Sequence, residues 1–112
     1  FNYISITYRF FDHGIWAVED RNTGDFIGLA GLYFKNDRER YFLSYFIMPE
    51  HRKKGYAYEI SKAIIEKTYK SVKPAIEIKK GNIPSLKLAE KLAKYSKEML
   101  KYPIDIFRLD ML

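Results

Sequence analysis

The hydrophobic residues in the first half of the chain gather in three short segments separated by polar ones. These segments cover residues 15–19, 26–34 and 41–48, and each predicts a β-strand. The residues between them are typical of turns, with Asn-Thr-Gly-Asp at 22–25 and a highly charged run at 35–40. Consecutive strands joined by short turns predict an antiparallel meander.

The segment ahead of the meander, residues 3–12, fits two different periods. Its apolar residues favour a helix when they are taken at a spacing of three and four, as at Ile4, Tyr8 and Phe11. They favour a strand when every second position is taken. Gly14 would suit the end of a helix, because glycine readily adopts the left-handed conformation found there. The pattern by itself leaves both structures open.

The second half of the chain predicts helices around a further strand. Residues 56–69 carry apolar side chains at helical spacing, which predicts an amphipathic helix. Residues 75–78 show no helical stripe and predict a strand, and Pro84 suits the first turn of a second helix. Residues 95–100 and 104–109 could pair through a turn, which predicts a closing hairpin.

These elements predict the α+β fold class, with a mixed, mostly antiparallel sheet flanked by helices. The crossover from strand 41–48 through helix 56–69 to strand 75–78 should make those two strands parallel. Such a junction between antiparallel and parallel strands is where ligands can enter a sheet. The length suits a single domain over residues 1–112. Because the chain opens at Phe1 without an initiating Met, we expect an N-terminal part to be missing.

Composition narrows the classes of function. The chain has no Cys, which excludes disulfides, thiolate metal sites and a cysteine nucleophile, and we expect no metal. No window approaches the roughly 20 apolar residues of a membrane span, and no signal-peptide pattern opens the chain, so we expect a cytoplasmic protein with no membrane partner. The net charge of +6 favours a polyanionic partner such as a nucleotide cofactor or a nucleic acid, although solubility alone would also explain it.

A basic segment that contains a glycine joins the strand 41–48 to the helix 56–69. Its residues are Arg52, Lys53, Lys54, Gly55, Tyr56 and Ala57. Free backbone N–H groups and the positive end of the helix dipole meet at such a junction, and both favour phosphate. Gly55 permits close approach of a ligand to the backbone, and the small Ala57 leaves the first helical turn open. The segment indicates a pyrophosphate site, with a solvated turn as the alternative.

The run from Tyr45 to Glu59 strongly resembles the acetyl-CoA signature of GNAT N-acetyltransferases, an apolar strand and Pro followed by Arg/Gln-x-x-Gly-x-Gly/Ala. A second stretch, from Asn82 to Leu92, is similar to the Asn-x-x-Ser and Glu-Lys-Leu segment of the RimJ/RimL-like branch, which acetylates ribosomal-protein N-termini. The resemblance implies a GNAT-like fold and acetyl-CoA as co-substrate. It also tips residues 3–12 toward the end of a helix.

The resemblance further implies which residues hold the cofactor. The strand before the loop should splay from its parallel neighbour and hydrogen-bond the pantetheine arm through the backbone of Phe46, Ile47 and Met48. The pyrophosphate should lie over residues 52–57. Asn82 and Ser85 should meet the cofactor from the other side; the alternative is that Asn82 caps a helix and Ser85 merely belongs to its first turn. The full cofactor set is Phe46, Ile47, Met48, Arg52, Lys53, Lys54, Gly55, Tyr56, Ala57, Asn82 and Ser85.

The chemistry implied by the family is direct attack of an unprotonated amine on the thioester, which needs no protein nucleophile. Many members supply the proton for the departing thiolate from a Tyr seven positions after the Asn, but Ala89 stands there in this chain. Ser85 could instead hydrogen-bond the sulfur. Glu50 is one candidate base; the alternative is that Glu50 is only an exposed surface carboxylate. The other candidates for the base are Asp12, His13, His51 and a water relay.

The leading hypothesis is therefore an acetyl-CoA-dependent N-acetyltransferase that acts on a primary amine, either a peptide N-terminus or a small molecule. Tyr33, Tyr41 and Tyr45 could line its acceptor cleft, although core packing is the ordinary role of so many tyrosines. The alternatives are a catalytically silent acyl-CoA-binding module and a basic nucleic-acid-binding domain. The last is disfavoured because no RNA-binding motif is present. The sequence leaves a homodimer open.

Overall fold

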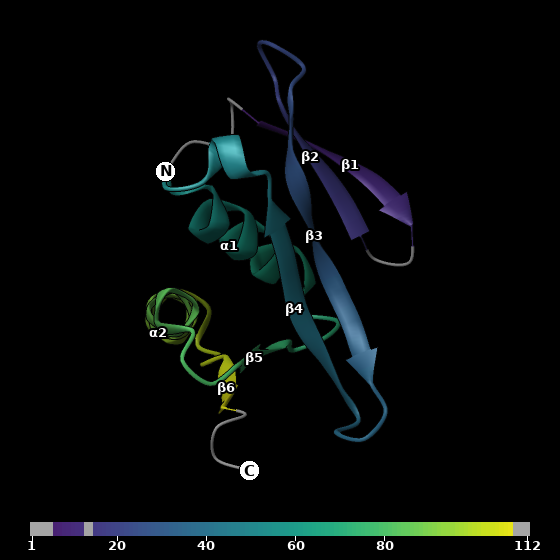
Figure 1. Ribbon diagram of the computed structural model, residues 1–112. Coiled ribbons are helices and arrows are strands. Elements are labelled where there is room, and N and C mark those ends of the chain that lie inside the picture. The colour runs from purple at the N-terminus through teal and green to yellow at the C-terminus, as the bar shows by residue number, and fades with distance from the viewer. Residues whose placement is uncertain (1–5, 13–14, 109–112) are drawn as a thin grey trace.

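The computed structural model describes residues 6–12 and 15–108 and shows one six-stranded sheet with its strands in chain order (Figure 1). The first four strands form an antiparallel run, in which the predicted meander is confirmed, and β5 follows as predicted. The elements in chain order are β1 (Ile6–Asp12), β2 (Ile15–Asp20), β3 (Phe26–Lys35), β4 (Arg40–Ile47), the 3-10 turn η2 (Pro49–His51), α1 (Tyr56–Thr68), β5 (Ala75–Ile78), α2 (Ile83–Tyr95), the π-helical turn η3 (Ser96–Leu100) and β6 (Asp105–Arg108).

The strand pairing changes direction at β4. β3 and β4 pair antiparallel along the whole length of β4, from Gly28 opposite Ile47 to Lys35 opposite Arg40. β4 and β5 are parallel, as the crossover predicted, but they pair at a single position, Phe42 opposite Ala75. Beyond that position the two strands diverge, and Figure 1 shows β5 running away from β4. The sheet therefore has a gap between these strands toward the C-terminal end of β4.

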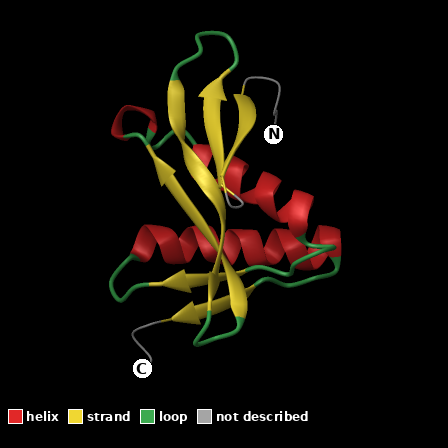
Figure 2. Cartoon of the chain, turned by 90° about the vertical axis from the view of Figure 1, so that its right-hand side faces the viewer, coloured by secondary structure: helices red, strands yellow, loops and turns green. Residues whose placement is uncertain are grey.

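Both helices lie on one face of the sheet, behind the strands in the view of Figure 2. The predicted apolar face of α1 is confirmed, because Ile60, Ile64 and Ile65 are fully buried. They pack against strand residues of the same core, and burial of each such side chain contributes about 1.5–3 kcal/mol. The rest of this core comes from the strands, from α2 and from the residue before β6, namely Val18, Ile27, Ala30, Leu43, Ile47, Ile76, Ile78, Ala89, Leu92 and Ile104. In the described residues, no helix is long and apolar enough to cross a membrane.

The helical interpretation of the first segment is wrong where the structure describes it. Ile6–Asp12 forms β1, which pairs antiparallel with β2 from Ile6 opposite Asp20 to Asp12 opposite Ile15. Residues 3–5 and Gly14 lie outside the described residues. The strand prevails because β2 offers a free edge whose backbone groups pair with the alternating segment, a contact that local periodicity does not reveal.

The predicted closing hairpin is also wrong. Residues 96–100 prolong α2 as the turn η3, and β6 pairs parallel with β5, from Asp105 opposite Ala75 to Arg108 opposite Ile78. The reason lies in Ser96, which is fully buried. Its hydroxyl donates a hydrogen bond to the carbonyl of Ala93 and accepts one from the backbone N–H of Ile104 at 3.0 Å. This pair of bonds ties the end of the helix to the strand that follows.

The Tyr102 hydroxyl donates a hydrogen bond to the Pro74 carbonyl, and burial raises the pKa of Tyr102 to about 12. Tyrosine in the unfolded chain ionises near pH 10, so the native state holds the proton more tightly. This contribution to stability is complete below about pH 10 and is lost as the pH rises toward about 12. We expect urea denaturation to show the free energy of unfolding falling over that interval, and less steeply in Tyr102→Phe. Equal slopes for both proteins would contradict this assignment.

Candidate cofactor cleft

The loop between β4 and α1 has the backbone conformation that a phosphate cradle needs. Gly55 lies directly before α1 with a φ of 83°, in the left-handed region that favours glycine. A Cβ at this position would meet nothing within 4 Å, so the glycine serves the backbone turn and leaves the space above it open. Lys53 also has a positive φ, of 64°, which is unusual for a residue with a side chain.

The N-terminus of α1 offers unused hydrogen-bond donors. None of the side chains that the structure describes caps this helix, and its first backbone bond runs from the N–H of Glu59 to the carbonyl of Gly55. The N–H groups of Tyr56, Ala57 and Tyr58 therefore lack partners within the helix. α1 contains 13 residues, and its dipole adds partial positive charge at the same end. This end of the helix is suited to bind an anion.

Arg52 fastens the loop to the end of β4. Its Nε donates a hydrogen bond to the carbonyl of Ile47 at 2.9 Å, and its guanidinium lies 5.6 Å from the centre of the Phe46 ring. Arg52 therefore positions the loop as well as adding positive charge beside it. Lys53 and Lys54 are exposed on the same loop.

In a strand, successive residues direct their backbone N–H and C=O groups alternately toward the neighbouring strands on its two sides. Only every second residue of β4 therefore directs these groups into the gap beside β5. Met48 follows β4, and its N–H donates a hydrogen bond to the carbonyl of Ile27 at 2.8 Å. The backbone groups of Met48 therefore point toward β3. Phe46 shares that direction. The backbone groups of Tyr45 and Ile47 therefore face the gap, and of the three predicted pantetheine contacts Ile47 is best placed.

The two sequence motifs, far apart in the chain, line one cleft of about 760 Å³. The end of β4, the loop, the start of α1 and the first turns of α2 form its walls. Of the predicted cofactor residues, the cleft is lined by Phe46, Ile47, Arg52, Lys53, Gly55, Tyr56, Ala57, Asn82 and Ser85. Met48 and Lys54 do not line it. Glu50 is exposed on η2 and does not line it either.

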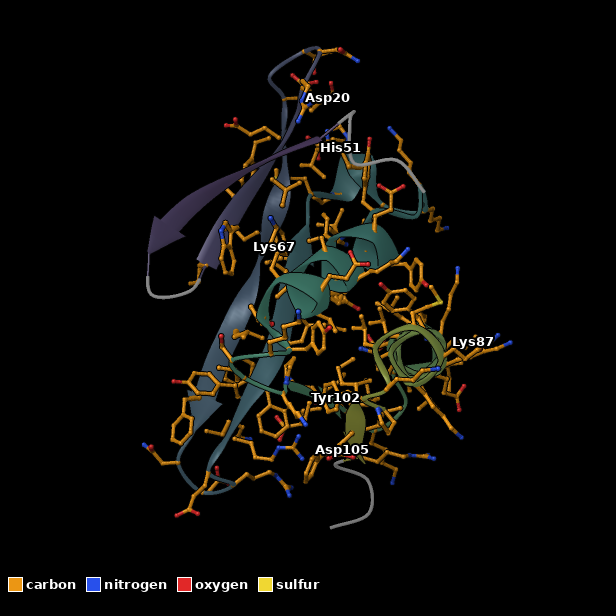
Figure 3. The ribbon with its side chains drawn as sticks, turned by 180° about the vertical axis from the view of Figure 1, so that it is seen from behind. Asp20, His51, Lys67, Lys87, Tyr102 and Asp105 are labelled. Carbon is orange, nitrogen blue, oxygen red and sulfur yellow. The ribbon has the colours of Figure 1, made fainter. Side chains whose placement is uncertain are left out.

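Sequence reasoning missed a second set of basic residues on this cleft. Lys87 and Lys91, one turn apart on α2, line it, and Figure 3 shows Lys87 projecting from α2. The Lys91 ammonium lies 4.1 Å from the centre of the Tyr58 ring on α1. No carboxylate is present among the described residues that line the cleft. The cleft therefore carries unopposed positive charge, which fits the phosphate groups of a nucleotide cofactor.

Asn82 has a structural role that the sequence left open. Its Oδ1 accepts a hydrogen bond from the backbone N–H of Ser85 at 3.2 Å, so it caps the N-terminus of α2. We expect Asn82→Ala to lower the free energy of unfolding by about 1 kcal/mol, because one helix-end donor loses its partner. Asn82→Ser should keep most of the free energy of unfolding that Asn82→Ala loses. Chemical denaturation of the two variants measures the difference, and equal losses would contradict the capping role.

A second cavity, of about 280 Å³, occupies the gap between β4 and β5 and adjoins the cofactor cleft. Tyr45, Ser85 and Leu88 line both. Ser85 therefore stands where the two spaces meet, beside Ala89, which is fully buried. Of the tyrosines predicted for an acceptor cleft, Tyr33 and Tyr45 line this cavity, whereas Tyr41 does not.

The remaining candidate bases lie apart from this gap or outside the described side chains. His51 lines the cofactor cleft, its ring packs edge-on against Tyr56, and its buried Nδ1 has no hydrogen-bond partner among the described residues (Figure 3). Asp12 ends β1, and its side chain is not described; His13 lies outside the described residues. No group of three or more His, Asp or Glu residues in the described part of the chain could hold a metal ion.

The sequence is similar to a known protein family and to a known protein. A protein-family model described as an acetyltransferase (GNAT) domain matches residues 4–93. The uncharacterized protein YkkB of Bacillus subtilis (strain 168) is 30% identical over 101 residues, which cover 83% of this chain and 59% of that protein.

Solved structures give the same fold. A putative GNAT-family acetyltransferase from Bordetella pertussis aligns with a TM-score of 0.65 and 26% identity over 71% of this chain and 52% of its own. A GNAT-family acetyltransferase from Bacillus anthracis aligns with a TM-score of 0.58 and 21% identity, over 70% of this chain and 49% of its own, and supports the fold alone. The chain thus spans between about half and three-fifths of the length of these relatives.

Proposed function

Because the chain belongs to the GNAT family of acetyltransferases, we propose that it binds acetyl-coenzyme A in this cleft and transfers the acetyl group to a primary amine. One observation carries the proposal: a basic loop and the start of α2, far apart in sequence, line a single cleft at the uncapped N-terminus of α1. The Asn82 to Leu92 segment supports placement in the RimJ/RimL-like branch.

The cleft residues divide into three groups by what they can bind. The first-turn N–H groups of α1, with Lys53 nearby, would hold the pyrophosphate. The backbone groups of Tyr45 and Ile47 would hydrogen-bond the amide groups of the pantetheine arm, although Arg52 already donates to the Ile47 carbonyl. The thioester would then lie at the entrance of the gap, beside Ser85.

The proposed acetyl transfer takes place at the gap between β4 and β5, beside Ser85. The acceptor nitrogen attacks the thioester carbonyl carbon, a C–N bond forms, the C–S bond breaks, and a proton from the nitrogen ends on the departing sulfur. The Ser85 hydroxyl would donate a hydrogen bond to that sulfur and stabilise the charge that develops on it. With Ala89 at the position of the family's usual acid, no other hydroxyl of α2 lines the gap.

A silent acyl-CoA-binding module is the second candidate, and Ala89 favours it. Release of free thiol from acetyl-CoA in the presence of a broad panel of primary amines distinguishes the two. We expect thiol release that depends on the protein and on the amine, with kcat reduced about tenfold or more in Ser85→Ala and KM for acetyl-CoA little changed. Tight binding of acetyl-CoA without thiol release for any amine would select the silent module.

A further inference from the structure

The cavity between β4 and β5 is lined by residues from both faces of the sheet. On the helix side its lining belongs to the hydrophobic core, as at Leu43 and Ile76. On the opposite side it is lined by Tyr33, Ser44 and Glu77, which lie outside that core. A molecule could therefore reach the position beside Ser85 from the face of the sheet that carries no helix in the described residues (Figure 2).

Glu77 is the one charged side chain among the described residues that line this cavity. The Glu77 side chain is only 12% exposed, and its Oε2 is 2.8 Å from the Lys35 Nζ and 3.7 Å from the Arg38 Nε. Both cations approach the same oxygen, and the Tyr33 side chain also hydrogen-bonds this carboxylate, which still leaves part of its roughly four lone-pair sites for a further donor. Burial, and then the charge of Glu77, raise the pKa of the neighbouring Tyr33. A carboxylate only accepts hydrogen bonds, and an amine nitrogen donates them.

An apolar groove of about 310 Å³ on the same face leads to this cavity. Tyr33, Ser44 and Tyr45 line both spaces. Gly31 and Ser44 lie opposite each other on neighbouring strands, and their small size leaves room between bulkier side chains. The remaining described lining residues are Ile15, Leu29, Ala30, Leu32 and Phe46. None of the described residues of this groove is charged.

We propose that the acceptor is a primary amine attached to an apolar body, and that it enters from this helix-free face. The apolar body lies in the groove beside Gly31 and Ser44. The nitrogen donates a hydrogen bond to Glu77 at the entrance of the gap that leads to Ser85. This assignment rests on the proposed acetyl transfer, and it makes Glu77 an acceptor-binding residue and the groove a determinant of specificity.

The test is calorimetric titration of n-butylamine, n-hexylamine and 1,4-diaminobutane into the full chain saturated with desulfo-coenzyme A. Each added methylene should tighten binding about fourfold, the effect of burying one CH₂ group. 1,4-Diaminobutane should bind at least about tenfold more weakly than n-butylamine, because its second ammonium loses water in an uncharged groove. Ser44→Phe should fill the groove and abolish the dependence on chain length.

Glu77→Gln should weaken the binding of both monoamines by about tenfold or more, since a charge-assisted hydrogen bond is lost. Asp105→Asn is the matched control: Asp105 forms an ion pair with Arg40 at 2.6 Å but lines neither space, and its variant should bind as the parent does. Equal affinity for 1,4-diaminobutane and n-butylamine, or unchanged affinity in Glu77→Gln, would overturn the proposal. Failure of desulfo-coenzyme A to bind in the first step would instead overturn the proposed function on which it rests.

Discussion

Gly55→Asp is expected to weaken acetyl-CoA binding about 100-fold or more. The new side chain would project into the open space above the loop, where a Cβ meets nothing within 4 Å, and would place a negative charge where the pyrophosphate should lie. The left-handed φ of 83° adds backbone strain. A hundredfold loss corresponds to about 2.7 kcal/mol, which the loss of one or two charge-assisted hydrogen bonds would produce. Isothermal titration calorimetry measures the affinity directly.

Gly24→Asp is the matched control for this variant. Gly24 has a φ of 79°, a Cβ there also meets nothing within 4 Å, and the residue lies in the turn between β2 and β3, outside the cofactor cleft. It therefore carries the same strain and the same added charge, and we expect unchanged affinity for acetyl-CoA. If both variants lost affinity equally, or if Gly55→Asp bound as the parent protein does, the phosphate site would not be at this loop.

Gly28→Ala is expected to destabilise the fold by about 3 kcal/mol or more, the other large effect. A Cβ at Gly28 would lie 2.0 Å from the carbonyl oxygen of Phe46 and 3.1 Å from the Cα of Ile47. Both are backbone atoms of the neighbouring strand, so relief requires β3 and β4 to separate. The midpoint of thermal unfolding should fall by about 10 °C or more. Acetyl-CoA binding should weaken as well, because Phe46 and Ile47 line the cleft.

Gly81→Ala separates this steric effect from the general cost of replacing a glycine. Gly81 has a φ of 82°, but nothing lies within 4 Å of a Cβ at that position. Its replacement should cost only about 1 kcal/mol, from backbone strain. Thermal unfolding of Gly28→Ala that matches that of Gly81→Ala would contradict the close approach of β3 and β4.

The parts of the fold that the sequence predicted are those set by local patterns. The meander follows from apolar segments separated by turn residues, and α1 follows from the helical spacing of Ile60 and Ile64. The helix expected at β1 was wrong, and β6 was predicted as a strand but with residues 95–100 as its partner, because the pairing of each strand depends on residues outside its own segment. In β1 the sequence satisfied two periods, and pairing with β2 selected one of them. In β6 the buried Ser96 directs the chain to the edge of β5 instead of into a hairpin.

The candidate site likewise has parts that local sequence patterns predicted and parts that depend on how distant segments pack together. The loop from Arg52 to Gly55 was found because its residues are contiguous and lead directly into a helix. The contribution of Lys91 was not found, because it depends on how α2 packs beside Tyr58 of α1. Its spacing of four from Lys87 was the signal available, yet two lysines one turn apart are ordinary on an exposed helix. Nothing local to Glu77 indicated that it lines the gap between β4 and β5.

The most direct test of the central claim is calorimetric titration of the chain with acetyl-CoA and, in parallel, with desulfo-coenzyme A. Both ligands carry the pyrophosphate that the loop and the N-terminus of α1 should hold, and only one carries the thioester. We predict that both bind, with similar affinity and with one site per chain. Binding of neither ligand would contradict the cofactor site, and the net charge of +6 would then make nucleic-acid binding the next property to measure.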